Sequence, residues 1–165
     1  MRGKAWVLGD NIDTDQIYPG KYLPLTDPKE MARHALEGMD GFENFSERVR
    51  KGDFLVAGKN FGCGSSREHA AVSLKEVGVA LVVAESFARI YYRNSINIGY
   101  PVLECEGITK RVLQGDTLDI EPSSGTIKNE RTGERIQATP LSGLEKEISD
   151  AGGLLEYIKR TIDWP

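Results

Sequence analysis

Short apolar runs and stretches of helical spacing alternate along the first two thirds of the chain. Continuous apolar runs predict strands, and apolar residues recurring every three or four positions predict helices. The expected strands are Lys4–Leu8, Phe54–Ala57, Val79–Ala84 and Tyr100–Glu104, and the expected helices are Lys29–Glu37, Ser65–Val77 and Phe87–Ser95. The strand–helix–strand–helix–strand order from residue 54 to residue 104 indicates a parallel sheet with crossover helices.

The pattern changes in the last third of the chain. Apolar and polar residues alternate in Thr117–Ile120, Gly125–Asn129 and Glu134–Ala138, which predicts a β-hairpin with one half-exposed face. Helical spacing returns from Leu141 and is interrupted at Gly152–Gly153. The whole pattern predicts an α/β fold with a mostly parallel sheet core and an added β-hairpin. The length of 165 residues fits a single domain spanning residues 1–165.

Three local features set expected boundaries. Asp27 followed by Pro28 is a strong start for a helix, with the aspartate as N-cap. Gly78 ends the helix that precedes it. The polar segment Asp10–Gln16 is expected to be a loop in which Asp10 and Asp13 have structural roles.

Composition narrows the classes of function. The net charge is −4, and no basic stripe points to nucleic acid. No apolar run approaches the ~20 residues that span a bilayer. The apolar stretch near Met1 is too short for a signal peptide. We therefore expect a cytoplasmic protein that binds neither a membrane nor nucleic acid.

Cysteine and histidine are scarce. Cys63 and Cys105 are the two cysteines, and His34 and His69 are the two histidines. Two distant cysteines form no disulfide framework. They also cannot supply the set of thiolates that usually holds an iron–sulfur cluster. If a metal takes part in the chemistry, most of its ligands are expected from another chain.

The segment Lys59–Ala70 carries the clearest chemical pattern. It follows a predicted strand and opens a predicted helix, and Gly62 and Gly64 allow close approach of the backbone to a ligand. The N-terminus of a helix offers free N–H groups to an anion. Arg67 adds a donor pair that suits a carboxylate. The segment therefore predicts an anion-binding loop.

A structural interpretation of the same segment also applies. Ser65 and Glu68 have the Ser-x-x-Glu spacing of a capping box, which would explain both residues without a ligand. A cap needs neither flanking glycines nor a second serine, so the loop as a whole favours anion binding. The segment matches neither a P-loop nor a dinucleotide fingerprint nor a hydrolase elbow.

Three motifs together carry a family resemblance. They are FGCGSSREH at Phe61–His69, DNIDTDQI at Asp10–Ile17, and SFARI at Ser86–Ile90. Their order and spacing across residues 4–105 resemble the swivelling domain of the aconitase superfamily. The chain length is similar to that of the free-standing small subunits of isopropylmalate dehydratases and homoaconitases. The resemblance implies a three-layer β/β/α swivelling domain.

The resemblance also implies a reaction and a partner. The partner is a cysteine-bearing large subunit, in a heterodimer or heterotetramer, that holds a [4Fe–4S] cluster on three cysteines. The open iron of that cluster acts as a Lewis acid on a small di- or tricarboxylic hydroxy acid. Cys63 is not a cluster ligand in the family, so we expect it to pack within the loop. The activity expected is that of a hydro-lyase in leucine biosynthesis.

Roles carry over from the family residue by residue. Ser65 matches the catalytic base, which removes a proton from the carbon next to a carboxylate. Ser66 and Arg67 match contacts to a substrate carboxylate. Asp15 matches an acidic active-site position that orients a neighbouring group, although a turn residue with an Asx hydrogen bond explains it nearly as well. His69 is expected to pack. Arg89 is a candidate to pair with a carboxylate, and a structural salt bridge is the favoured interpretation.

The family's substrate discriminator matches Tyr22-Leu23-Pro24-Leu25-Thr26. Enzymes that accept a third carboxylate carry an arginine in this region, and this chain has none. An apolar loop suits an isopropyl group, at roughly 0.8 kcal/mol per buried methylene-sized group. We therefore expect isopropylmalate rather than homocitrate. Lys21 could reach a carboxylate, however, so homoaconitase or a broad 2-alkylmalate hydro-lyase stays open. A non-catalytic anion-binding regulatory module is the alternative from another class.

Overall fold

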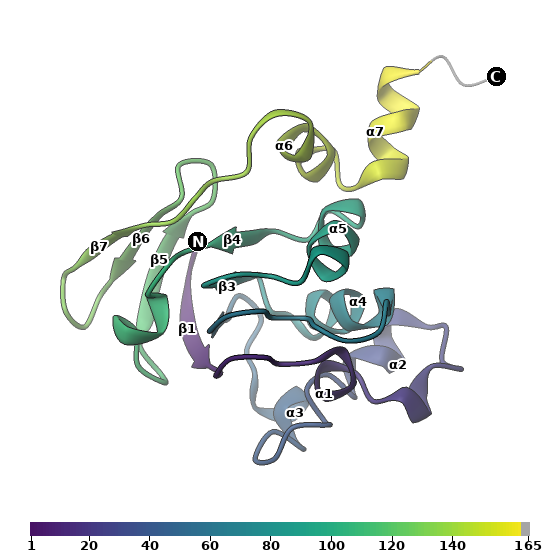
Figure 1. The fold of residues 1–165 in the computed structure, drawn as a ribbon, viewed down its shortest axis with the longest axis horizontal. Helices are drawn as coiled ribbons and strands as arrows, with labels where there is room; N and C mark the ends of the chain where they lie inside the picture. The colour runs from purple at the N-terminus through teal and green to yellow at the C-terminus, as the bar shows by residue number, and fades with distance from the viewer. Residues whose placement is uncertain (163–165) are drawn as a thin grey trace.

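A computed structural model describes residues 1–162 and contains one seven-stranded mixed sheet (Figure 1). The strand order is β4-β3-β2-β1-β5-β6-β7. The strands are β1 (Arg2–Val7), β2 (Phe54–Ala57), β3 (Leu81–Ala84), β4 (Val102–Glu104), β5 (Thr117–Glu121), β6 (Thr126–Asn129) and β7 (Arg135–Gln137). Strands β1 to β4 are parallel, whereas β5, β6 and β7 form an antiparallel meander.

Strand β1 joins the two halves of the sheet. On one side it pairs in parallel with β2, with Ala5 opposite Phe54. On the other side it pairs antiparallel with β5, with Gly3 opposite Leu118. The predicted parallel core with an added antiparallel hairpin is therefore confirmed.

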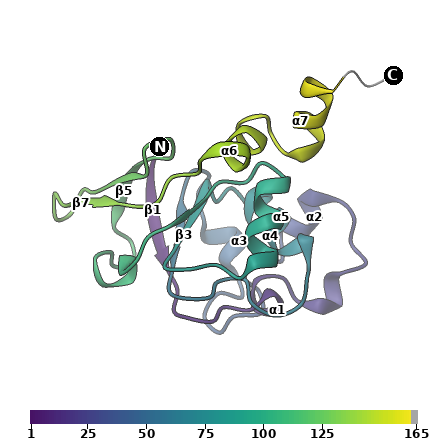
Figure 2. The ribbon, with the colours of Figure 1, turned by 45° about the horizontal axis from the view of Figure 1, so that its top comes forward.

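Seven helices accompany the sheet in the part of the chain that the structure describes. They are α1 (Thr14–Ile17), α2 (Pro28–Ala32), α3 (Phe45–Arg48), α4 (Glu68–Val77), α5 (Arg89–Asn97), α6 (Gly143–Asp150) and α7 (Leu154–Thr161). Two 3₁₀ turns, Gly20–Tyr22 and Ile108–Lys110, complete the elements. In Figure 2, α2 to α5 lie on one side of β1 and β3, and β5 and β7 lie on the other.

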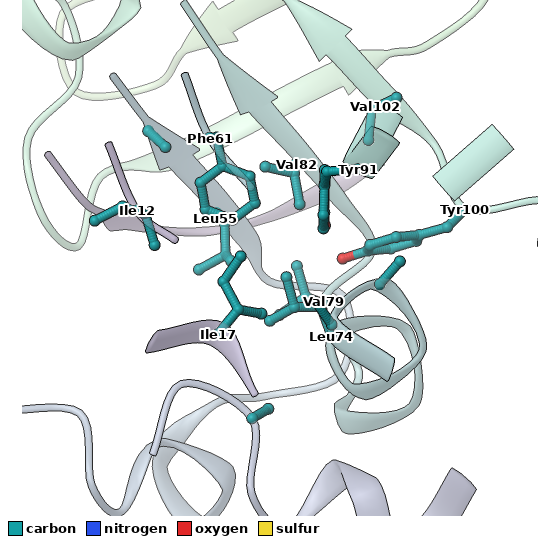
Figure 3. Packing of buried hydrophobic residues seen from close by; sticks show 14 of the residues in the cluster. Ile12, Ile17, Leu55, Phe61, Leu74, Val79, Val82, Tyr91, Tyr100 and Val102 are labelled. Atoms are coloured by element: carbon teal, nitrogen blue, oxygen red, sulfur yellow. The ribbon is translucent and has the colours of Figure 1, made fainter. Parts of the chain in front are cut away.

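The central parallel strands are buried on both faces, as their continuous apolar sequence predicts. Leu55 and Val82 belong to the core on the helix side, together with Phe61, Leu74 and Tyr91 (Figure 3). The alternate residues of the same strands belong to a second core beneath the antiparallel strands. The second core includes Phe54, Val56, Leu81, Val83, Leu118, Ile120, Ile127 and Ile136. The expected three-layer arrangement is therefore present.

Several expected boundaries are wrong or shifted. Residues 14–17 of the expected loop form helix α1, whose N-cap is Asp13. The helix expected from Lys29 to Glu37 is regular only through Ala32. Residues 33–35 continue in tighter turns with hydrogen bonds three residues back, and Leu36 has a left-handed backbone with φ +58°. Helix α5 begins at Arg89, two residues later than expected.

The start of α4 corrects an expectation of the sequence. Helix α4 begins at Glu68 rather than Ser65, and its N-cap is Arg67 without a side-chain cap. The Ser65–Glu68 capping box is therefore wrong. A capping box exists instead at α1, where Asp13 and Gln16 exchange hydrogen bonds of 2.8 and 2.9 Å.

Two other boundaries are as expected. The Asp27 side chain accepts a hydrogen bond from the Lys29 N–H and caps α2. Gly78 ends α4 in the left-handed conformation at φ +107°. Within residues 1–162, no helix has the length and apolar character needed to cross a membrane.

Candidate active site

Two loops meet where the neighbouring parallel strands β1 and β2 end. Residues 9–20 follow β1 and residues 58–67 follow β2. Three backbone hydrogen bonds of 2.8 Å tie the loops together: Asn11 N to Lys59 O, Gly62 N to Ile12 O, and Thr14 N to Cys63 O. The motifs at residues 10–17 and 61–69 therefore belong to one site, next to which α1, α2 and α4 lie together (Figure 1).

The loop glycines are required by the backbone. Gly62 has φ +83°, and a Cβ there would lie 2.3 Å from the Cβ of Tyr91. Gly64 has φ +99°. A side chain at either position would be strained, and at Gly62 it would also collide with helix α5. The predicted close approach of the backbone is present, although at Gly62 it is to Tyr91 rather than to a ligand.

Ser65 and Ser66 lie exposed in the loop between Gly64 and α4. The Ser65 Oγ lies 3.3 Å from the Oγ1 of Thr14, a buried residue of α1. No side chain among residues 1–162 caps the first turn of α4. The N–H groups of Glu68 and His69 therefore stay available to an anion bound beside the serines, whereas the Ala70 N–H donates to the Arg67 carbonyl oxygen at 3.2 Å.

Arg67 lies across the site toward α1. Its Nη1 donates a 2.8 Å hydrogen bond to the Asp15 Oδ1 and a 3.4 Å hydrogen bond to the Tyr18 carbonyl oxygen. The same Asp15 oxygen accepts the Gly20 N–H at 2.8 Å. The hydrogen bonds from Arg67 and Gly20 hold the pKa of Asp15 below its ordinary value. Asp15 therefore accepts hydrogen bonds both from a neighbouring side chain and from the backbone of the following turn.

For His69 the structure agrees with the expected role, whereas for Arg89 it does not. The His69 ring stacks on the Tyr18 ring at 5.5 Å between centroids, so the expected packing role is confirmed. Arg89 is exposed at the start of α5. No carboxylate lies within salt-bridge distance of it in the described part of the chain, so the expected ion pair is wrong.

The loop that matches the substrate discriminator is apolar and only partly covered. Leu23, Pro24 and Thr26 are exposed, while Tyr22 and Leu25 pack against the core on the helix side. The Lys21 Nζ lies 5.1 Å from the centroid of the Tyr22 ring. A cation over an aromatic face is weakly attracted to it.

Four residues near the site had no role in the sequence analysis. Thr14 contacts Ser65, and Tyr18 links Arg67 to Tyr22, because the Tyr18 hydroxyl donates to the Tyr22 carbonyl oxygen at 2.6 Å. Glu37 and His34 contact Tyr22. Thr14 and Tyr18 lie within or next to the motif at residues 10–17, but no local pattern distinguishes Glu37 or His34.

The donor set of this chain does not fit an iron–sulfur cluster. Cys63 is half-buried in the site loop, and Cys105 is buried in the core beneath the antiparallel strands. Among residues 1–162, no three His, Cys, Asp or Glu side chains gather where they could hold a metal ion.

The chain is similar to known proteins over nearly its whole length. The family described as the aconitase C-terminal domain matches residues 10–106. The 3-isopropylmalate dehydratase small subunit 1 of Methanopyrus kandleri is 52% identical over 97% of this chain and 93% of its own length. The isopropylmalate/citramalate isomerase small subunit of Methanocaldococcus jannaschii is 48% identical over 98% of this chain and 95% of its own length.

A solved structure shares the fold. The crystal structure of a 3-isopropylmalate dehydratase chain from Methanocaldococcus jannaschii aligns with a TM-score of 0.91 and 45% sequence identity. The alignment covers 96% of this chain and 93% of that one.

Proposed function

The chain belongs to the aconitase C-terminal domain family and, within it, to the 3-isopropylmalate dehydratase small subunits, and from this premise we propose that it is the small subunit of a two-chain hydro-lyase. The complex interconverts 2- and 3-isopropylmalate by dehydration and rehydration in leucine biosynthesis. One observation carries the proposal at the level of residues: the Ser65–Arg67 loop lies against α1, where Asp15 holds Arg67.

Ser65 is the proposed base. Its Oγ takes the proton from the substrate carbon next to a carboxylate and returns it during hydration. A serine alkoxide is a costly base at neutral pH, so donors around it must stabilise the charge. Two features support this role: the Thr14 hydroxyl at 3.3 Å and the uncapped first turn of α4.

Ser66 and Arg67 are the proposed contacts to a substrate carboxylate. The Nη1 of Arg67 is directed to Asp15 and Tyr18, and among residues 1–162 no partner is found for its Nη2. That donor remains for a carboxylate, while Asp15 fixes the plane of the guanidinium. The proposed role of Asp15 is therefore to orient Arg67 before the substrate arrives.

We assign the [4Fe–4S] cluster to the large partner subunit. Cys63 lies in the site loop and Cys105 in the core beneath the antiparallel strands, and two cysteines cannot supply three ligands. The relatives are named small subunits, which supports a large subunit as the partner that completes the site.

Isopropylmalate is the proposed substrate rather than a tricarboxylate. Burying a charged group against Leu23 and Leu25 without a partner would be costly, whereas an isopropyl group suits them. Lys21, the cation that precedes this loop in the sequence, lies over the Tyr22 ring. The relative named isopropylmalate/citramalate isomerase makes citramalate the second substrate to test.

The experiment compares Ser65→Ala with wild type in the complex reconstituted with its reduced, cluster-bearing large subunit. Turnover of 3-isopropylmalate should fall below detection while the variant still assembles with the large subunit. Ser142→Ala, at an exposed serine whose side chain makes no hydrogen bond within the described chain, is the matched control. Normal turnover by Ser65→Ala would refute the assignment of the base. An inactive wild-type complex on isopropylmalate and citramalate would refute the function.

A further inference from the structure

The segment of residues 34–38 after α2 packs against the backbone of α1. The Leu36 N–H donates a 2.7 Å hydrogen bond to the Ile17 carbonyl oxygen. A Cβ on Gly38 would lie 2.5 Å from the Asp15 carbonyl oxygen, so no side chain fits there. Leu36 is fully buried and holds a left-handed conformation that leucine rarely adopts. The surrounding contacts therefore fix this segment relative to Asp15.

Two side chains of the same segment hold Tyr22. The Tyr22 hydroxyl donates to the Glu37 Oε1 at 2.5 Å, and the His34 Nδ1 lies 2.5 Å from the Glu37 Oε2. The Tyr22 and His34 rings stack at 3.5 Å between centroids, with 13° between their planes. Both oxygens of Glu37 are therefore engaged, and the tyrosine ring is held on its face and at its hydroxyl.

The backbone of Tyr22 is held from the other direction. Its carbonyl oxygen accepts the hydroxyl of Tyr18, a fully buried residue, at 2.6 Å. The carbonyl oxygen of Tyr18 in turn accepts a hydrogen bond from Arg67. Tyr22 is the first residue of the apolar loop Tyr22–Thr26, so these contacts set where the loop begins relative to Arg67.

The protonation states suit these hydrogen bonds at neutral pH. The hydrogen bond to Glu37 raises the pKa of Tyr22, burial adds to this, and Lys21 partly offsets it, so the hydroxyl keeps its proton. Burial acts to raise the pKa of Glu37, but hydrogen bonds from Tyr22 and His34 outweigh burial and lower it. Glu37 is therefore a carboxylate that accepts from both neighbours.

We propose that Glu37, together with His34, is a positioning residue that fixes Tyr22 and thereby sets which substrate side group the loop Tyr22–Thr26 accepts. The inference rests on the proposed function. In the described chain Glu37 contacts Tyr22 and His34 and acts through them. When Tyr22 loses its contact with Glu37, the positions of Leu23 and Leu25 relative to the carboxylate-binding Arg67 are no longer fixed. The isopropyl group then loses a fixed apolar wall, while a smaller group loses less.

The test measures kcat and KM in the assembled complex for 3-isopropylmalate and for 3-methylmalate, which carries methyl in place of isopropyl. Glu37→Ala should raise KM for isopropylmalate about tenfold and leave kcat within about twofold. The preference for isopropylmalate should fall about tenfold, within the range that a few methylenes provide. Tyr22→Phe should give a smaller fall, because the ring still stacks on His34. Glu37→Gln should retain most of the preference, because its amide oxygen still accepts from Tyr22.

The matched control is Glu30→Ala, at an exposed glutamate on α2 whose side chain makes no hydrogen bond in the described chain. It should change neither parameter. Hydrogen exchange of the amides in residues 20–26 adds a readout independent of turnover. This exchange should become faster in Glu37→Ala but not in Glu30→Ala.

If Glu37 had only a structural role, Glu37→Ala would lower the active fraction of the complex equally for both substrates, and that result would overturn the inference. An unchanged preference for isopropylmalate over methylmalate in an active Glu37→Ala complex would also overturn it. If Glu37→Ala does not assemble, the same outcome in Tyr22→Phe decides the question. A wild-type complex inactive on both malates would refute the proposed function instead.

Discussion

Residues 1–162 contain two aspartate–arginine pairs whose carboxylates differ sharply in their surroundings. In the antiparallel half, the Asp116 side chain is 4% exposed and accepts Arg131 at 2.6 Å, Asn129 at 2.9 Å and the Leu113 N–H at 2.8 Å. At the site, the Asp15 side chain is 68% exposed and accepts Arg67 and the Gly20 N–H. The Asp116 carboxylate is enclosed by several donors, although its partner Arg131 is 48% exposed. The Asp15 carboxylate is exposed, and its partner Arg67 is 21% exposed.

The difference in burial between the Asp15 and Asp116 carboxylates predicts that the two ion pairs have different roles. An exposed ion pair contributes about 0–1 kcal/mol to stability, so the Asp15–Arg67 pair adds little to folding. It can instead exchange partners when a substrate carboxylate arrives. The buried Asp116 carboxylate cannot exchange partners in this way, because removing it leaves the Asn129 amide and the Leu113 N–H without their acceptor. We therefore expect the Asp15–Arg67 pair to serve recognition and the Asp116–Arg131 pair to serve stability.

Among variants of the two aspartate–arginine pairs, Arg67→Ala should have the largest effect, and that effect should be on the kcat/KM of the complex. Losing a charge-assisted contact of about 1.5–3 kcal/mol lowers kcat/KM for isopropylmalate roughly 100-fold. The free energy of unfolding should fall by no more than about 1 kcal/mol. Arg131→Ala is the matched control, with lower stability and an unchanged kcat/KM. Equal effects of the two variants on turnover would contradict the division of roles.

Asp116→Ala should lower the free energy of unfolding by about 2 kcal/mol, as measured by urea denaturation. The hydrogen bond to Arg131 is the main cause that holds the pKa of Asp116 at about 2, below its ordinary value of 3.8. That difference corresponds to about 2 kcal/mol. The kcat/KM of folded complex should be unchanged. Asp119→Ala, at an exposed aspartate on β5, is the control and should be nearly neutral.

The free energy of unfolding at acidic pH should depend on the Asp116–Arg131 pair. The folded pKa of Asp116 lies below its unfolded value, so its contribution is present above pH 4 and is lost as the pH falls from about 4 to 2. Wild type should therefore lose about 2 kcal/mol more than Asp116→Asn across that window, as measured by denaturation at each pH. Parallel pH curves for the two proteins would show that the pair contributes no stability.

Sequence patterns captured what is set locally. The apolar runs predicted the buried strands, Asp27 predicted the start of α2 and Gly78 predicted the end of α4. Each of these features depends on residues that are close in the sequence. The division into three layers came from the family resemblance, since periodicity alone does not show how the antiparallel strands fold beneath β2 and β3.

The start of α4 shows why local patterns fail at the site. The Ser65–Glu68 spacing favours a cap, yet the backbone stays extended at Arg67, with φ −110° and ψ 108°. Arg67 contacts Asp15, 52 residues earlier, and this pairing accompanies the later helix start. Leu36 is similar, because its left-handed backbone accompanies the hydrogen bond from its N–H to Ile17. Neither contact can be foreseen from neighbouring residues.

Asp15→Ala should give the smallest effect, and it tests whether the exposed pair orients Arg67. Without the carboxylate, Arg67 keeps its contact to the Tyr18 carbonyl oxygen but loses the shorter hydrogen bond that fixes its plane. The KM for isopropylmalate should rise about fivefold to tenfold, corresponding to roughly 1 kcal/mol, with stability changed by less than about 1 kcal/mol. Asp15→Asn should restore much of the loss, because its amide oxygen still accepts from Arg67 and Gly20. A fall in kcat as large as that of Ser65→Ala would instead place Asp15 among the groups that transfer the proton.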